Sequence, residues 1–221
     1  MRAATSARPG RLPPRPAASS ARKPPRPPRE GRGAGAARLL LAAALLAGYL
    51  PGLWAGRSGQ TGLGQQLAAY YGQAEQFSAW GPLCLDQLAA AFLQLFFVLL
   101  CGFFAAGPVL LGLFFAAKGL FWGFCAANIL QQNGAAGLLL YWVWAYLPAL
   151  CLFFLCLWLA GYAAQLSGRL FQSVFGGGAP RGQLHAAARR LGVRFGVALL
   201  CAGLLSVVLS ALGAFAARWV G

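Results

Sequence analysis

Lys118 is the residue of this 221-residue chain whose position most strongly suggests chemistry. Between Asp86 and Arg169 it carries the only formal charge, in a stretch rich in Leu, Phe, Ala and Gly. A Lys at the centre of a membrane helix costs about 2.5–3.5 kcal/mol to insert, and such residues serve transport, proton transfer or internal structure. Lys118 therefore needs a polar partner inside the membrane.

The sequence offers two acceptors for the Lys118 ammonium. If the segments that carry Gln94 and Lys118 form an antiparallel hairpin, Gln94 lies about one helical turn from the level of the lysine. Asp86 would lie roughly 16 Å away, too far for an ion pair. Pro148 lacks an N–H and so frees the carbonyl of Trp144 as the second acceptor.

A structural interpretation of Lys118 stands beside the functional one. Its side chain would snorkel along the helix, or the helix would break at Lys118-Gly119 and let the ammonium reach the cytoplasmic face. In both cases the lysine stabilises the membrane domain and takes no part in transport.

Other reactive side chains form no catalytic or metal-binding pattern. Five of the six cysteines fall inside apolar segments, where Cys packs as a small apolar residue, and no Cys or His cluster has ligand spacing. His185 lies in a polar stretch and is expected on the surface. Glu75 and Asp86 are the acids expected outside, and no nucleophile motif or phosphate loop occurs. We expect no enzyme activity, no metal and no cofactor.

Composition places the protein in a lipid bilayer. Hydrophobic residues make up 59% of the chain and charged residues 10%, and each membrane helix needs about 20 mostly apolar residues. The net charge of +15 is concentrated at the N-terminus, in a Pro-, Ala- and Arg-rich segment without aromatic residues. We expect residues 1–38 to be a disordered basic cytoplasmic arm beside anionic lipid headgroups. Nucleic acid, the usual partner of such charge, is not expected, because no aromatic side chain can stack on bases.

We expect an all-α fold: a polytopic membrane helical bundle of about five transmembrane helices with a cytoplasmic N-terminus. Together the spans form a membrane domain over residues 39–217, at about 39–55, 87–107, 108–130, 137–162 and 195–217. The first apolar run could instead be a signal-peptide core, and the arm an organellar transit peptide. A retained span is favoured, because small residues do not occupy both key positions of the best cleavage sites.

Basic residues in the connecting loops set the orientation. An outward loop is expected at 57–85 and a cytoplasmic loop at 163–194, which contains the glycine hinge at 176–178. The cytoplasmic loop contains five arginines, whereas only Arg57 and Arg218 would lie outside. Aromatic anchors agree, with Trp158 and Tyr162 at the inner level.

Small residues predict where helices contact each other. Pairs spaced by four occur at Gly119 with Gly123 and at Gly192 with Gly196. A stripe of small residues continues along the last span through Gly203, Ser206 and Ser210. We expect internal packing at these positions, with dimerisation as the alternative.

The outward loop contains a candidate amphipathic helix at about residues 64–80. Apolar side chains that include Tyr70, Tyr71 and Phe77 recur there at helical spacing, opposite glutamines and Glu75. The helix would lie on the outer leaflet, or those three aromatic residues would dock a partner protein.

The order of motifs between residues 102 and 167 resembles the stage II sporulation protein M family of multi-pass membrane proteins. The motifs are Gly107-Pro108, Lys118-Gly119, Gly123, Asn133-Gly134, Gly137, Leu147-Pro148 and Leu166-Ser167. The resemblance covers about residues 39–217, and the Pro- and Arg-rich arm departs from the family pattern.

The resemblance implies a sporulation role. Such a protein is a non-enzymatic membrane scaffold that anchors and positions peptidoglycan hydrolases, a lytic transglycosylase and an amidase, during engulfment of the forespore. Its place would be the cell membrane, and specifically the septal mother-cell membrane. The alternative is a transport protein or permease subunit that uses the intramembrane Lys118.

Overall fold

The computed structural model of the chain describes residues 30–58, 62, 64–66, 79–175 and 181–220. Its helical elements are α1 (Glu30–Ser58), α3 (Trp80–Phe103), α4 (Gly107–Tyr141), the π-helix η2 (Trp142–Tyr146), α5 (Leu147–Phe175) and α6 (Arg181–Val220). In these ranges five helices are long and apolar enough to cross a membrane. The predicted all-α polytopic bundle is confirmed, and the chain is a multi-pass membrane protein.

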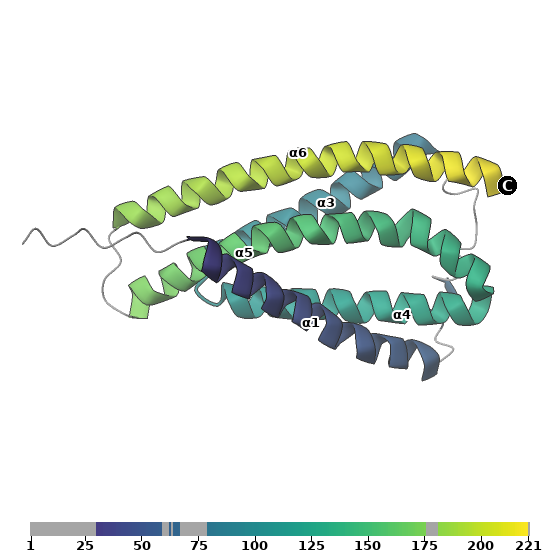
Figure 1. Cartoon of the computed structure of the whole chain (residues 1–221), viewed down its shortest axis with the longest axis horizontal. Helices are drawn as coiled ribbons and strands as arrows, with labels where there is room; N and C mark the ends of the chain where they lie inside the picture. The colour runs from purple at the N-terminus through teal and green to yellow at the C-terminus, as the bar shows by residue number, and fades with distance from the viewer. Residues whose placement is uncertain (1–29, 59–61, 63, 67–78, 176–180, 221) are drawn as a thin grey trace, which may run out of the picture.

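The five apolar helices form an antiparallel bundle with α5 at its centre (Figure 1). α5 contacts α1, α3, α4 and α6, while α1 lies obliquely across α4 and α5. The start of α1, the α3–α4 turn, the end of α5 and the start of α6 share one end of the bundle. The sequence predicts the basic arm and the loop at 163–194 on one side of the membrane, and the helix ends next to both lie at this common end.

Large apolar side chains divide into an interior set and a lipid-facing set. Leu95, Leu111, Phe115 and Leu159 are completely buried among the helices. Many other Leu, Val and Phe side chains, such as Leu200 at 73% exposed, point away from the bundle. In a bilayer these outer side chains contact acyl chains, so the exposed apolar surface is the membrane contact of the protein.

The helix that carries the first span is longer than the predicted span 39–55. α1 begins at Glu30, so residues 30–38 of the predicted disordered arm are helical. Ala34 is 1% exposed, and its carbonyl lies against Gly161 of α5. Packing of this alanine-rich turn on α5 accounts for the extension, because tertiary contacts stabilise helices more than local preference does.

The segment predicted as a cytoplasmic loop at 163–194 is mostly helical. α5 continues to Phe175 and α6 begins at Arg181, immediately after Pro180 in the sequence. The extension has a physical cause, because Ala163, Leu166 and Leu191 of these segments are buried and pack the two helices together beyond the expected span ends. The glycine hinge lies outside the described residues.

The predicted boundaries around 131–147 also change. α4 continues to Tyr141 with a kink at Gly134, whose φ of 65° and ψ of −163° are non-helical. Glycine tolerates this positive φ without a steric penalty. The fourth span runs from Leu147, with η2 immediately before it, and not from residue 137. Since Pro148 cannot donate to the fourth carbonyl before it, the wider π-helix accommodates the missing bond.

Candidate functional site

Backbone contact between α1 and α4 positions the intramembrane lysine. We call the contact the glycine seam; it consists of Gly48, Gly52 and Gly56 of α1 and Gly119 and Gly123 of α4. A Cβ added to Gly48 would lie 1.9 Å from the carbonyl oxygen of Ala116, and one added to Gly52 would lie 2.1 Å from that of Leu120. No real Cβ can occupy such positions, so only glycine permits this approach.

The α4 side of the glycine seam is equally close. A Cβ on Gly119 would lie 2.0 Å from the Leu45 carbonyl oxygen, and one on Gly123 would lie 2.2 Å from the Tyr49 carbonyl oxygen. Small residues spaced by four bring membrane helices together because van der Waals contact and weak Cα–H···O bonds then replace contact with lipid. The predicted helix contact at Gly119 and Gly123 is therefore internal, with α1 as partner.

A buried asparagine continues this contact beyond Gly56. Asn128 is 2% exposed, and its side-chain Nδ2 donates to the Phe124 carbonyl oxygen at 2.9 Å. Its Oδ1 lies 2.2 Å from the position that a Cβ on Gly64 would take. After α1, the chain therefore contacts α4 again where Gly64 lies against Asn128.

The glycine seam fixes the direction of Lys118. Successive residues of an α-helix point about 100° apart, so Lys118 turns away from α1 when Gly119 faces it. Among the residues of α4, the one with non-helical backbone angles is Gly134. The alternative of a helix break at Lys118-Gly119 is wrong, because the backbone of α4 is helical at both residues.

Lys118 finds its polar partner on α3. Its Nζ donates a hydrogen bond to Gln94 Oε1, and lies 5.2 Å from the ring centroid of Trp122 and 5.9 Å from that of Phe114. The fully buried thiol of Cys156 on α5 is an electrostatic neighbour of the same ammonium. Rings at these distances attract a cation through their negative faces. One amide and two rings thus share the charge of Lys118.

An aromatic cluster encloses the lysine from the α5 side. The ring of Phe153 meets Phe115 at 5.6 Å and Trp122 at 5.9 Å, both edge to face, and Trp122 lies 5.3 Å from Tyr146. Phe115, Trp122 and Phe153 are all at most 8% exposed. These offset geometries are the favourable ones for aromatic pairs. The arrangement can hold a cation in an apolar interior.

The described acids do not reach this site. Asp86 is exposed near the start of α3, two helical turns before Gln94. The Trp144 carbonyl, the other acceptor expected for Lys118, belongs to η2 at the far end of α4. The site thus contains a hydrogen-bonded lysine and no described carboxylate with which it could exchange a proton.

Two motifs that are distant in the sequence meet at the α3–α4 turn. Ser167 of α5 is completely buried, and its hydroxyl donates to the carbonyl oxygens of Phe104 and Ala105. A Cβ on Gly107 would lie 2.8 Å from the same hydroxyl oxygen. Pro108 stands at the first positions of α4, where its missing N–H costs nothing. The tight turn predicted at Gly107-Pro108 lies slightly earlier, at 104–106, and Gly107 and Pro108 begin α4; Ser167 supports this turn.

Other expected site residues lie at the far end of α4. Gly137 is buried, and a Cβ there would lie 2.2 Å from Asn133 Cβ, across the kink at Gly134. Pro148 follows η2. These residues shape the α4–α5 connection. Within the described segments, the contacts of Lys118 are with other residues.

The small residues of α6 behave in two ways. Ser206 and Ser210 are buried, and the Ser210 hydroxyl donates to Gln87 Oε1 of α3 at 3.2 Å. Gly203 lies within 3.9 Å of Leu88, measured from an added Cβ. At Gly192 and Gly196 an added Cβ would meet no atom within 4 Å. The expectation of internal packing is thus wrong for these two glycines, because α6 turns that face away from the described helices.

The remaining candidates divide between surface, interior and undescribed residues. His185 is exposed, as expected, and all six cysteines are free thiols. The proposed docking residues Tyr70, Tyr71 and Phe77 lie outside the described residues. Sequence reasoning missed Gly48, Gly52, Gly56 and Asn128, although the spacing of the three glycines by four is itself a packing signal.

Comparisons of the chain with protein-family models, with curated proteins and with solved structures found no match.

Proposed function

We propose that this chain is a non-enzymatic membrane scaffold whose bundle holds partner proteins at the membrane. The supporting observation is the enclosure of Lys118, which bonds to Gln94 between aromatic rings in the bundle interior. A translocating lysine must change partners during a cycle, whereas this one is held by Gln94 of α3 and by two aromatic rings of its own helix. The glycine seam adds rigidity to the same region.

In its finer form, the proposal takes its partners from the resemblance in the sequence. The partners are then cell-wall hydrolases, a lytic transglycosylase and an amidase, positioned at the septal mother-cell membrane during engulfment. Such enzymes act outside the membrane, so the outward loop at 57–85 is the segment with access to them. Aromatic side chains are favoured anchors of protein interfaces, which selects Tyr70, Tyr71 and Phe77 as the contact residues.

Replacing those three residues with Ser tests the finer proposal. The variant should stay in the membrane at normal abundance but recover less hydrolase when it is purified from sporulating cells. The matched control replaces Gln65, Gln66 and Gln73 of the same loop with Ser and should leave hydrolase recovery unchanged. Equal recovery from both variants would exclude this loop as the contact surface.

Transport is a second candidate, favoured by the presence of an ionisable side chain in the bundle interior. Lys118→Met distinguishes the two functions, since Met keeps the length of the side chain and removes its charge. A scaffold should retain its partners and its cellular function with this substitution. Loss of function in a fully assembled and abundant Lys118→Met protein would favour transport.

A further inference from the structure

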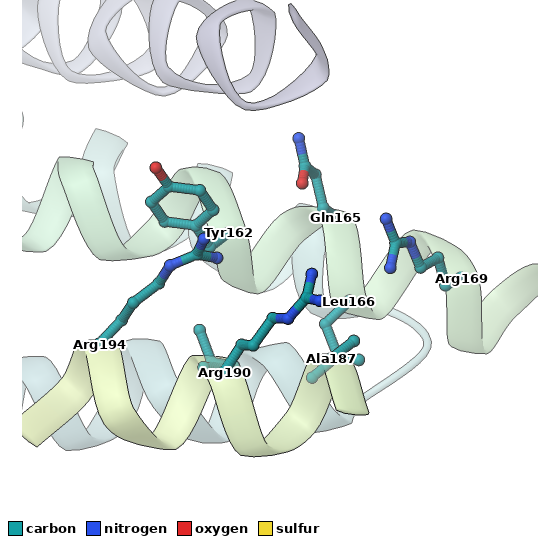
Figure 2. A pocket seen from close by; sticks show the side chains of 8 residues that line it. Tyr162, Gln165, Leu166, Arg169, Ala187, Arg190 and Arg194 are labelled. Carbon is teal, nitrogen blue, oxygen red and sulfur yellow. The ribbon is translucent and has the colours of Figure 1, made fainter. Parts of the chain in front are cut away.

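A second cluster of charge lies between α5 and α6, at the end of the bundle where α1 begins (Figure 2). We call it the arginine pocket. Its α5 residues recur at i, i+3, i+4 and i+7 from Tyr162 to Arg169, and its α6 residues recur at the same spacing from Ala187 to Arg194. This spacing places each set on one helix face. Figure 2 shows Arg190 and Arg194 reaching from α6 toward α5.

Arginines of α5 and α6 line this pocket, and Arg38 of α1 adjoins it through the ring of Tyr162. Arg194 Cζ of α6 lies 3.6 Å from the ring centroid of Tyr162, and Arg38 Cζ of α1 lies 5.0 Å from the same centroid. The Arg38 side chain also donates from Nη2 to the Trp158 carbonyl oxygen at 3.5 Å, while its Nε is buried without a hydrogen-bond partner. One tyrosine ring therefore adjoins two cations, which repel each other without an anion nearby.

The acids of the chain cannot balance this charge. The whole sequence has three, of which Asp86 is at the opposite end of the bundle near the start of α3. Glu75 lies outside the described residues. Among the described residues, Glu30, the first residue of α1, belongs to a helix end on this side. The three lining arginines and Arg38 therefore face at most two carboxylates, which leaves a positive excess whatever contacts the arginines make.

The span ends expected from the sequence place the pocket at the lipid headgroup layer. Tyr162 and Phe195 are the sequence-predicted ends of two spans, and Arg194 already meets Tyr162 at that level. Arg169 lies seven residues further along α5, a rise of roughly 10 Å. Each headgroup layer is about 5–7 Å thick beyond the hydrocarbon core. The guanidinium groups thus extend from the hydrocarbon boundary through the headgroups.

An apolar stripe leads from the pocket into the membrane. Along α6, Val193, Val197, Leu200 and Leu204 are exposed and follow Arg190 at helical spacing. Acyl chains can lie along such a stripe while a headgroup remains among the arginines. A soluble anion would gain nothing from it, so the combination selects a lipid.

We infer that the arginine pocket binds the phosphate of an anionic phospholipid headgroup, with the acyl chains along the exposed stripe of α6. Guanidinium groups form paired, charge-assisted hydrogen bonds with phosphate oxygens, and basic pockets between membrane helices are suited to anionic headgroups. The bound lipid would join α5 and α6 at this end of the bundle. This inference is independent of the proposed scaffold function.

Native mass spectrometry of the full purified chain tests the inference. The protein in detergent is titrated with phosphatidylglycerol and with phosphatidylcholine of the same acyl chains. The chain should bind phosphatidylglycerol more tightly, and Arg190→Gln and Arg194→Gln should each weaken that binding by roughly fivefold or more. The matched control is Arg189→Gln, which removes one charge from an exposed position of the same helix that does not line the pocket.

The outcomes separate a built site from diffuse charge. If Arg189→Gln weakens phosphatidylglycerol binding as much as Arg190→Gln does, the basic surface acts without a pocket and the inference fails. Inorganic phosphate could instead bind the chain and displace the lipid. If Arg190→Gln abolishes both the phosphate binding and the displacement, the ligand is a soluble phosphate and the lipid assignment is overturned. Should Arg194→Gln fail to assemble, Arg190→Gln decides, because Arg190 is an exposed side chain.

Discussion

Alanine substitutions in the glycine seam should separate two effects of glycine, the close helix contact that it permits and the low helix propensity that it brings. Gly119→Ala places a methyl group 2.0 Å from the Leu45 carbonyl oxygen, where ordinary van der Waals contact begins at 3.4 Å. The helices must therefore move apart by on the order of 1 Å, and overpacking of this kind costs about 1–3 kcal/mol. On the same helix, Gly112 has no atom within 4 Å of an added Cβ. Gly112→Ala should be neutral or should stabilise by up to about 1 kcal/mol through helix propensity.

A second matched pair tests the α1 side. Gly48→Ala would meet the Ala116 carbonyl oxygen at 1.9 Å, whereas Gly35→Ala would meet no atom within 4 Å. The assay heats each detergent-solubilised variant and measures by size-exclusion chromatography the fraction that stays monodisperse. For a chain of this size, 1 kcal/mol moves the midpoint by roughly 2–4 °C, so the seam variants should lose several degrees. Midpoints equal to those of Gly112→Ala and Gly35→Ala would refute the close approach of α1 and α4.

Three further results are expected. In the same thermal assay, Lys118→Met should change stability by less than about 1 kcal/mol, because removal of a costly charge offsets the lost hydrogen bond. Gln94→Leu should cost more, and the double variant should recover most of that loss. Ser167→Ala should destabilise by about 1 kcal/mol, since the α3–α4 turn loses the hydroxyl that donates to its carbonyl oxygens; an unchanged midpoint would contradict that role. In a chain whose native cysteines are replaced, impermeant thiol labelling of intact cells should modify Gln132→Cys and leave Gln172→Cys unreacted; the reverse pattern would invert the predicted orientation.

The sequence was sufficient for features that depend on local chemistry. Long apolar runs require helices in a bilayer, so five spans could be predicted from composition and length. The helix start at Gly107-Pro108 and the kink at Gly134 follow from the backbone preferences of Pro and Gly. The Lys118 bond to Gln94 was also within reach, because an antiparallel hairpin brings those residues to one level.

Features that depend on the neighbour of each helix could not be predicted in this way. Gly192 and Gly196 have the same spacing as Gly119 and Gly123. Gly119 and Gly123 face α1, whereas a Cβ added to Gly192 or Gly196 would meet no described atom within 4 Å. Local sequence does not say which small-residue face finds a partner. The helical ends of α5 and α6 were missed for the same reason, since their charged residues suggest a loop until the contact of Tyr162 with Arg194 is known.

The glycine seam and the lysine site together restrict how this bundle can move. Each seam glycine lies against a carbonyl of the opposite helix, so sliding α1 along α4 would bring side chains against backbone at the next turn. Rocking α4 away from α3 would leave the Lys118 ammonium without its Gln94 acceptor in an apolar interior, where an unpaired charge is costly. Alternating access that slid α1 along α4 or rocked α4 away from α3 would break these contacts. Resistance to both movements favours the proposed scaffold, which holds other proteins in fixed positions, over the carrying of a solute across the membrane.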